Sequence, residues 1–241
     1  MVDKEKSGSI TISYGMPKSA STFAWMLLKD FLVATGRPVA TLSRAAKGNR
    51  SLLDYSVSLD ERRLSDMKIE VDRKAVVLKT HSAVKAFADY TQFFADSYVF
   101  VQHRDPRDII LSLIDHAARS RDKGIKDFIE CVNVEKSFPT VDGAMRAFFS
   151  WANKPNAHLI SYEQLCFNTH ETILRLEKIY DAKVDIDKLM SNYNDKRVIR
   201  QFNKGVRSRW CDEMSTKHSE MVQERYSRYY NFIKDLGQSA A

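Results

Sequence analysis

Short apolar runs alternate with longer amphipathic stretches over the first three quarters of the chain. The short runs are rich in β-branched and aromatic residues, and they predict strands at 9–15, 75–79, 98–103 and 157–162. Between and after these runs, apolar positions recur at helical spacing and predict helices at 22–34, 106–120, 140–152 and 169–180. Beyond residue 185 the pattern is helical and is interrupted by a polar loop at 203–217.

Strands that alternate with helices require crossover connections, which favour a parallel sheet covered by helices on both faces. We therefore expect an α/β fold of three layers, with a central parallel sheet of four to five strands and a helical C-terminal part. No linker, repeat or low-complexity run divides the chain, so a single domain over 1–241 is expected, with flexible ends at 1–8 and 238–241. In such folds ligands bind outside the carboxyl ends of the strands.

Composition limits the class of protein and its partners. A hydrophobic fraction of 44% with 11% aromatic residues indicates a folded globule. The net charge of +7 predicts attraction to polyanions or to a highly charged small anion. A multiply charged nucleotide explains the positive charge as well as a nucleic acid does. Because the basic residues are scattered and form neither a tail nor a basic helix, we expect no nucleic acid partner.

Cysteine usage and the apolar segments indicate the compartment. The three cysteines, Cys131, Cys166 and Cys211, are an odd number without short spacing, so neither a disulfide framework nor a zinc site is indicated. The first residues carry no apolar signal core, and the longest apolar stretch, 23–34, is too short to span a bilayer. We expect a soluble, cytoplasmic protein.

The segment from Gly15 to Trp25 leads from a predicted strand into a predicted helix. Such a turn presents unpaired backbone N–H groups and the positive end of a helix dipole, and Lys18 adds a full charge. The segment lacks the spacing of glycines and lysine that defines a Walker A loop. Taken alone, it fits an anion-binding loop and an ordinary Ser/Thr helix cap equally well.

The residues Pro17-Lys18-Ser19-Ala20-Ser21-Thr22-Phe23 resemble the 5'-phosphosulfate loop of sulfotransferases that use 3'-phosphoadenosine 5'-phosphosulfate (PAPS). The resemblance implies that these residues bind the cofactor, namely Lys18, Ser19, Ala20, Ser21, Thr22 and Phe23. The family has glycine where this chain has Ala20. Since a positive φ would penalise alanine, we expect residue 20 to adopt a conformation that alanine tolerates.

Lys79-Thr80-His81 closes the second predicted strand, and the corresponding strand of cytosolic sulfotransferases also ends in Lys-Thr-His. Transfer to a hydroxyl needs a base near the acceptor proton, and a neutral imidazole suits this role near pH 7. His81 is the candidate base, and Lys79 is expected against the sulfuryl or bridging oxygens. The following Ser82-Ala83 departs from the family, which often has an apolar residue and proline there.

The segment from His103 to Leu113 resembles the 3'-phosphate motif of the same family almost throughout. Arg104 follows the strand, and Ser112 lies just over two helical turns further on. A guanidinium and a hydroxyl can together bind a phosphate. Pro106 suits the first helical turn, and Asp105 and Asp108 suit the helix dipole there.

Two weaker segments complete the resemblance. Tyr162 matches the family tyrosine that contacts the adenine. In 202–210, Lys204, Gly205 and Trp210 match the late loop that covers the 3'-phosphate, whereas Asn203 replaces the family arginine and Ser208 its second glycine. Either Arg207 or Arg209 can supply the missing donor. The segments 37–72 and 121–139 match no motif.

Together these segments imply a PAPS-dependent sulfotransferase with a P-loop-like fold. It would transfer a sulfuryl group in line to a hydroxyl or amine, with His81 as general base and Lys18 and Lys79 assisting, and release 3'-phosphoadenosine 5'-phosphate (PAP). No metal is expected, because lysines and amides can stabilise the developing charge. The acceptor is a small molecule, lipid or carbohydrate, and a homodimer is compatible with the sequence. Two alternatives stay open: a P-loop kinase that uses ATP and Mg²⁺, and a non-catalytic polyanion-binding protein.

Overall fold

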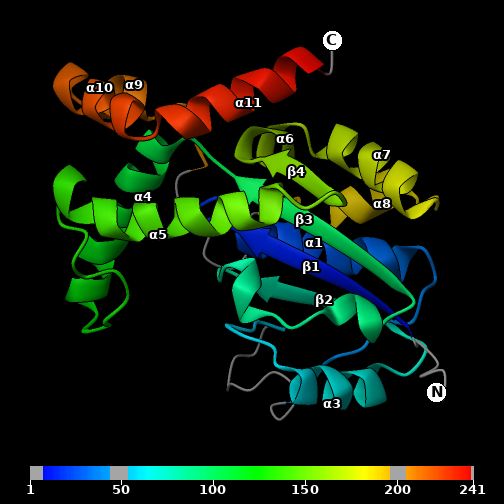
Figure 1. Cartoon of the computed structure of the whole chain (residues 1–241). Helices are drawn as coiled ribbons and strands as arrows, with labels where there is room; N and C mark the ends of the chain where they lie inside the picture. Colours follow the sequence, from blue (N-terminus) through cyan, green and yellow to red (C-terminus); the bar gives the residue numbers. More distant parts are fainter. Residues whose placement is uncertain (1–7, 44–53, 196–204, 240–241) are drawn as a thin grey trace. The chain divides into compact units, whose positions relative to one another are not determined.

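The computed structural model describes residues 8–43, 54–195 and 205–239 (Figure 1). The chain divides into two compact units, of which unit 1 comprises 1–103 and 146–202. Unit 2 comprises 104–145 and 203–241. The expectation of a single domain stays a prediction.

Unit 1 is built on a four-stranded sheet. Its strands are β1 (Ser9–Gly15), β2 (Ala75–Thr80), β3 (Asp96–His103) and β4 (Ala157–Ser161), and all neighbouring pairs are parallel. The order β2-β1-β3-β4 places β1 and β3 in the centre, and every residue of β1 is buried. Near-continuous apolar runs form such strands because both faces are covered, so the expected parallel sheet is confirmed.

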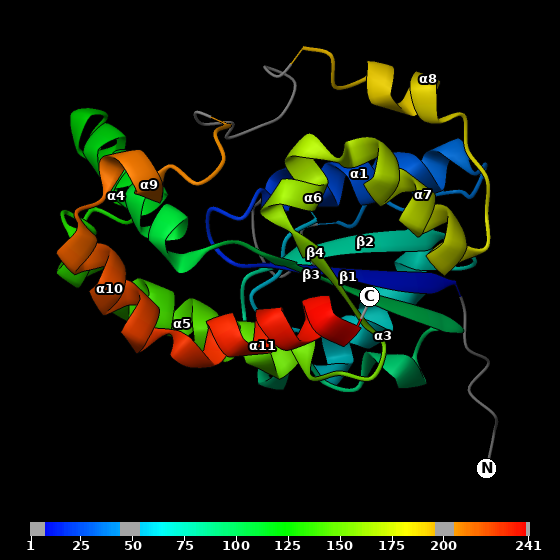
Figure 2. The same cartoon turned by 90° about the horizontal axis from the view of Figure 1, so that it is seen from above.

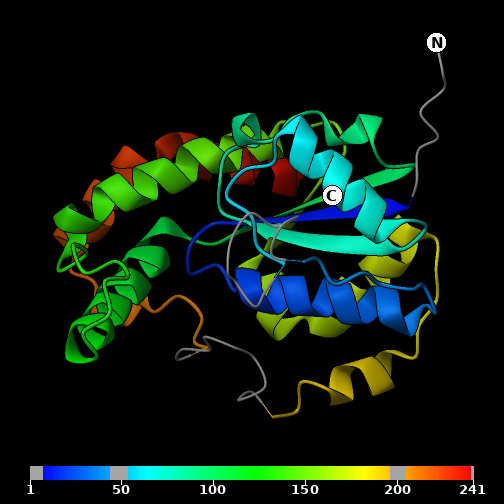
Figure 3. The same cartoon turned by 90° about the horizontal axis from the view of Figure 1, so that it is seen from below.

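Helices cover both faces of this sheet. Figure 2 shows α1 (Ser21–Ala34), α6 (Tyr162–Phe167) and α7 (Thr169–Tyr180) on one side, and Figure 3 shows α3 (Glu61–Val71) on the side opposite α1. The face toward α1 holds a core that includes Phe31, Phe100 and Tyr180. On the same face the buried Thr11 Oγ1 and Tyr180 Oη lie 2.7 Å apart in a hydrogen bond. Unit 1 also contains α8 (Ile186–Ser191) and two short 3₁₀ helices, η1 (Val84–Ala86) and η2 (Tyr90–Gln92).

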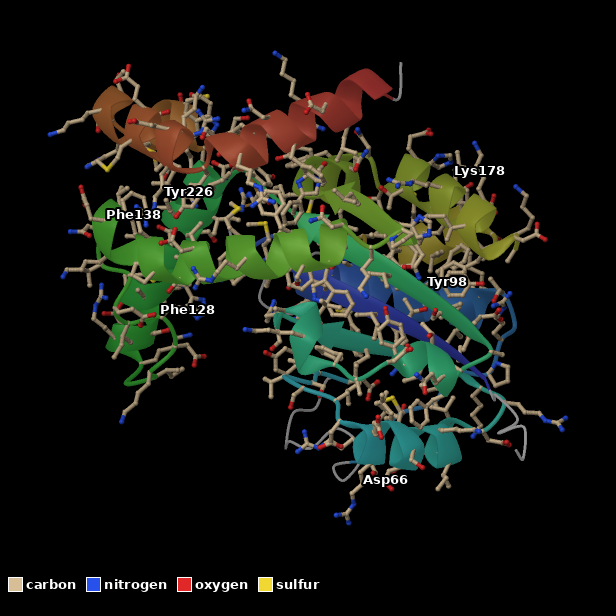
Figure 4. The ribbon with its side chains drawn as sticks, in the orientation of Figure 1. Asp66, Tyr98, Phe128, Phe138, Lys178 and Tyr226 are labelled. Atoms are coloured by element: carbon tan, nitrogen blue, oxygen red, sulfur yellow. The ribbon has the colours of Figure 1, made fainter. Side chains whose placement is uncertain are left out.

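Unit 2 is helical over its described residues. It contains α4 (Pro106–Asp122), α9 (Trp210–Glu213), α10 (Thr216–Arg225), α11 (Ser227–Ser239) and the first part of α5 (Val134–Ala152). The rings of Phe138 and Tyr226, labelled in Figure 4, meet edge to face with centroids 6.3 Å apart. Beside them, Arg225 Nη2 pairs with Asp142 Oδ2 at 2.5 Å, which attaches α10 to α5.

Several element boundaries differ from the sequence expectation. The helix expected from 140 begins at Val134 and includes Pro139. The fourth strand ends at Ser161, because the Ser161 hydroxyl and the Gln164 side chain form a capping box that begins α6 at Tyr162. The described part of the loop expected at 203–217 contains α9 and the start of α10, and α3 has no counterpart in the expectation. Within the described ranges, no helix is long and apolar enough to cross a membrane.

Candidate active site

The loop between β1 and α1 begins with a tight turn. The Ser19 amide donates to the Met16 carbonyl at 3.2 Å, and the Ser19 hydroxyl donates to the same carbonyl at 2.7 Å. Pro17 fixes a negative φ at the first central position, and Lys18 has φ 65° at the second. This combination is that of a type II turn, a geometry in which glycine is usual at the position of Lys18.

Ala20 is also left-handed, with φ 61° and ψ 25°. The expectation that this residue adopts a conformation that alanine tolerates is wrong. The left-handed geometry costs an L-residue about 1–2 kcal/mol, and the family glycine would adopt it freely. Ala20 is the N-cap of α1 and gives no side-chain hydrogen bond to the helix. The orphan N–H groups of the first turn therefore have no cap from this residue, as an anion site requires.

Strand β3 contacts the loop through Gln102. The Gln102 carbonyl accepts from the Met16 amide at 3.0 Å, and its side-chain Oε1 accepts from the Ser13 hydroxyl at 3.2 Å. Gly15 allows the close approach of helix and strand, because a Cβ at this position would overlap the Ser21 Cβ and lie 3.1 Å from the Gln102 Oε1. The loop is thus held by packing and hydrogen bonds on two sides.

Lys79 lies at the end of β2 with only 4% of its surface exposed. Its ammonium donates to the Thr22 hydroxyl of the first turn of α1 at 2.9 Å. Burial, and then the charge of Lys18, lower the pKa of Lys79 to about 8. Two lysines that affect one another electrostatically make this end of the sheet an anion-attracting site.

His81 is partly buried immediately after β2. Its Nδ1 lies 2.5 Å from the Gly15 carbonyl oxygen. Because a carbonyl can only accept, Nδ1 carries the proton, and Nε2 of the neutral ring keeps its lone pair. Burial lowers the pKa of His81 to about 4, with further lowering by the charges of Lys79 and Lys18, while the bond to Gly15 acts in the opposite direction. The imidazole is therefore neutral at pH 7 and has the tautomer that a general base needs.

Tyr55 contacts both of these residues and was not found from the sequence. The Asp54 carbonyl accepts from the Lys79 amide at 2.7 Å, and the Ser56 amide donates to the Lys79 carbonyl at 2.9 Å. The half-buried Tyr55 ring lies 5.6 Å from the His81 ring centroid and 5.9 Å from the Lys79 Nζ. The segment around Tyr55 carries no motif, so its proximity to His81 and Lys79 follows only from its pairing with Lys79 of β2.

In unit 2, Arg104 is buried with 5% exposure. Its Nη2 donates to the Asp108 Oδ2 at 3.3 Å and to the Val206 carbonyl at 3.2 Å. Asp105 caps α4 by accepting from the Arg107 amide at 2.8 Å, and Pro106 occupies the first turn as expected. Ser112, also on α4, is buried with 3% exposure.

Arg207 and Arg209, the two candidates to replace the family donor at Asn203, have different surroundings, and the choice between them stays a prediction. The Arg209 guanidinium is 2% exposed, and it donates to both Glu213 carboxylate oxygens at 2.9 and 2.6 Å and pairs with Asp115 at 3.0 Å. Arg107 is likewise engaged, since it pairs with Asp105 at 2.6 Å and its Cζ lies 3.4 Å from the Trp210 ring centroid. Arg207 is exposed.

The remaining predicted residues occupy different surroundings. Phe23 belongs to the core on the α1 face, where its ring meets Tyr193 at 5.0 Å. Tyr162 is buried at the start of α6, and Gly205 has φ 64°. Lys204 lies outside the described residues. In unit 1 the structure brings together the loop residue Thr22 with Lys79, and the end of β1 with His81. In unit 2 it brings Arg104 to the segment that begins at Gly205.

No family model and no curated protein matches the sequence. Solved structures do match. The mouse sulfotransferase SULT7A1 complexed with PAP superposes with a TM-score of 0.60, covering 94% of this chain and 87% of that chain at 11% identity. Retinol dehydratase in complex with androsterone and inactive cofactor PAP gives a TM-score of 0.54, covering 91% of this chain and 80% of that chain at 16% identity.

The chain has the sulfotransferase fold. At these identities the likeness concerns the fold alone, and it agrees with the fold class expected from the sequence. This fold is also the one implied by the sequence segments that resemble the sulfotransferase family, which follow one another along the chain. The roles of individual residues rest on the resemblance and on the geometry described above.

Proposed function

We propose that the protein is a PAPS-dependent sulfotransferase that acts on a hydroxyl or amine of an acceptor. The observation that carries the proposal is the state of His81. Its Nδ1–H donates to the Gly15 carbonyl, and its neutral Nε2 is an acceptor beside Lys79 at the end of the sheet. A neutral base near the buried Lys79 and the half-buried Lys18 suits transfer from an anionic donor.

The loop after β1 is proposed to bind the 5'-phosphosulfate. Left-handed residues at Lys18 and Ala20 flank Ser19, a backbone pattern that turns successive N–H groups toward one concave side. The α1 dipole and the Lys18 charge add to the attraction for an anion. Thr22 would contribute its amide and its hydroxyl proton, since the hydroxyl oxygen accepts from Lys79 and the O–H is left to donate.

The 3'-phosphate is proposed to bind to Arg104, Ser112 and the segment that begins with Lys204 and Gly205, with Arg207 as the replacement donor. The contact between the Arg104 Nη2 and the Val206 carbonyl supports this proposal, since it joins the two motifs within unit 2. On the strength of the resemblance, Tyr162 is proposed to contact the adenine, and Phe23 is proposed as part of the 5'-phosphosulfate loop.

The reaction would proceed in line. The acceptor oxygen or nitrogen forms a bond to sulfur while the bond from sulfur to the bridging phosphate oxygen breaks, and the acceptor proton passes to the His81 Nε2. The electron pair of the broken bond stays on the phosphate oxygen of PAP, where Lys18 and Lys79 stabilise the charge. A bound anion would also raise the pKa of His81, because it offsets the lysine charges that lower that pKa, and so it would strengthen the base.

The acceptor is proposed to be a small molecule, lipid or carbohydrate. One protein of this fold was solved with the small molecule androsterone, which favours testing small hydroxyl compounds first. A cytoplasmic location and a homodimer stay predictions from the sequence.

The test is His81→Ala, assayed by label transfer from PAPS to a panel of phenols, alcohols and amines. We expect turnover to fall by roughly two to four orders of magnitude, the range for a positioned base, while calorimetry shows unchanged PAP binding. His116→Ala is the matched control, because this histidine of α4 packs edge to face on Phe128 and has no proposed role. Near-normal turnover in His81→Ala would remove the residue from the base role.

A further inference from the structure

Asp108 is a buried carboxylate near the start of α4. Its side chain is 1% exposed, and burial raises its pKa, while the charge of Arg104 and the hydrogen bond from the Trp210 amide lower that pKa. Asp105, which caps the same helix, is 22% exposed. A buried carboxylate is costly unless it is paired and hydrogen-bonded, so the partners of Asp108 decide what it does there.

The two carboxylate oxygens of Asp108 contact different segments. Oδ2 accepts from the Arg104 Nη2 at 3.3 Å, and Oδ1 accepts from the Trp210 backbone amide at 3.0 Å. The same Arg104 Nη2 donates to the Val206 carbonyl at 3.2 Å. Within unit 2, the pair Arg104 and Asp108 therefore contacts both ends of the segment 206–210, about a hundred residues further along the chain: Arg104 contacts Val206, and Asp108 contacts Trp210.

This arrangement has a physical consequence for Arg104. A buried guanidinium without a carboxylate is an uncompensated charge, and its planar donors need fixed partners to keep one orientation. Asp108 engages one terminal nitrogen, the Nη2 that also donates to the Val206 carbonyl. Because it also fixes the Trp210 backbone, it sets the position of that segment relative to the guanidinium.

We propose that Asp108 is a positioning residue that orients Arg104 and the segment 206–210 together, so that both face the 3'-phosphate of the nucleotide. The inference rests on the proposed function, and it assigns Asp108 a role beyond the start of a helix. It predicts that the residue governs discrimination between nucleotides with and without a 3'-phosphate.

The experiment measures calorimetric affinities of the full chain for PAP and for adenosine 5'-phosphate (AMP), which lacks the 3'-phosphate. In Asp108→Asn we expect PAP affinity to fall by about 10- to 100-fold, the range for a lost charge-assisted hydrogen bond, with AMP affinity unchanged. Asp142→Asn is the matched control. This carboxylate of α5 pairs with Arg225 of α10 at 2.5 Å, away from the segment 206–210, and its loss should leave the ratio of PAP to AMP affinity as in the wild type.

A double variant separates positioning from a general loss of structure. If Asp108 acts through Arg104, then Asp108→Asn in an Arg104→Ala background should not weaken PAP binding further. Thermal unfolding verifies that each variant folds. If Asp108→Asn does not fold, Asp108→Glu replaces it; this variant keeps the charge, so its ratio of PAP to AMP affinity should lie below that of the wild type but above that of a full loss. A wild-type ratio in every Asp108 variant that folds would overturn the inference. If the wild type binds PAP no better than AMP, both the proposed function and this inference are overturned. If the wild type prefers PAP and the Asp108 variants keep the same preference, only the inference is overturned.

Discussion

Acid should destabilise this protein through His103, the last residue of β3. The side chain is 7% exposed and packs on Phe148, with ring centroids 5.8 Å apart. Burial lowers the pKa of His103 from 6.5 to about 4. Because the unfolded state binds the proton more tightly, the stabilisation is fully present above pH 6.5 and is lost as the pH falls toward 4.

The magnitude follows from the two pKa values. Between pH 7 and pH 5 the unfolded state gains nearly all of its proton and the folded state almost none, which corresponds to about 2 kcal/mol, and the full window corresponds to about 3 kcal/mol. His103→Gln removes the titrating group. Urea unfolding at pH 7 and pH 5 should therefore show a loss of free energy in the wild type that is about 2 kcal/mol larger than in the variant.

Any packing free energy that His103→Gln loses is the same at pH 7 and at pH 5, so it does not affect the difference between the two measurements. His81 also titrates with a lowered pKa and acts equally in both proteins. Equal pH dependence of unfolding in the wild type and His103→Gln would mean that His103 has the same pKa in the folded and unfolded states, contrary to this prediction.

Three further substitutions test the structure of unit 1. Gly15→Ala should destabilise the protein by about 1–3 kcal/mol through overlap with Ser21, as measured by thermal unfolding, and should weaken PAP binding. An unchanged melting temperature would contradict the close approach at this glycine. Lys18→Ala should lower turnover by about 10²–10³-fold in the label-transfer assay, and unchanged kinetics would remove the loop from the site. Trp151→Ala should cost about 3–5 kcal/mol, because the indole is fully buried and donates to the Ser82 carbonyl at 2.8 Å. A loss below about 1 kcal/mol in urea unfolding would contradict that packing.

The parts of the fold and site that follow from local patterns could be predicted from the sequence. The strand 9–15 and the helix 169–180 have the expected bounds, because a buried parallel strand and an amphipathic helix each carry their own period. The loop at Lys18 and the pair Lys79 and His81 are contiguous motifs, so their position at strand ends was predictable.

Tertiary structure determined the rest. Ala20 adopts a left-handed conformation against the preference of alanine, between a turn in which Ser19 bonds to Met16 and a helix start where Ser21 lies close to Gly15. Tyr55 reaches His81 only through pairing of its segment with β2. The engagement of Arg209 likewise depends on a distant carboxylate, Asp115, that no spacing in the sequence reveals.

We propose that the protein binds a nucleotide with phosphates at both the 5' and 3' positions and uses it for sulfuryl transfer. The decisive experiment is calorimetric titration of the wild type with PAP in buffer without Mg²⁺. We expect one site with micromolar or tighter affinity, and Lys18→Ala should weaken binding at that site. Absence of binding at micromolar concentration, together with Mg²⁺-dependent turnover of ATP, would contradict it.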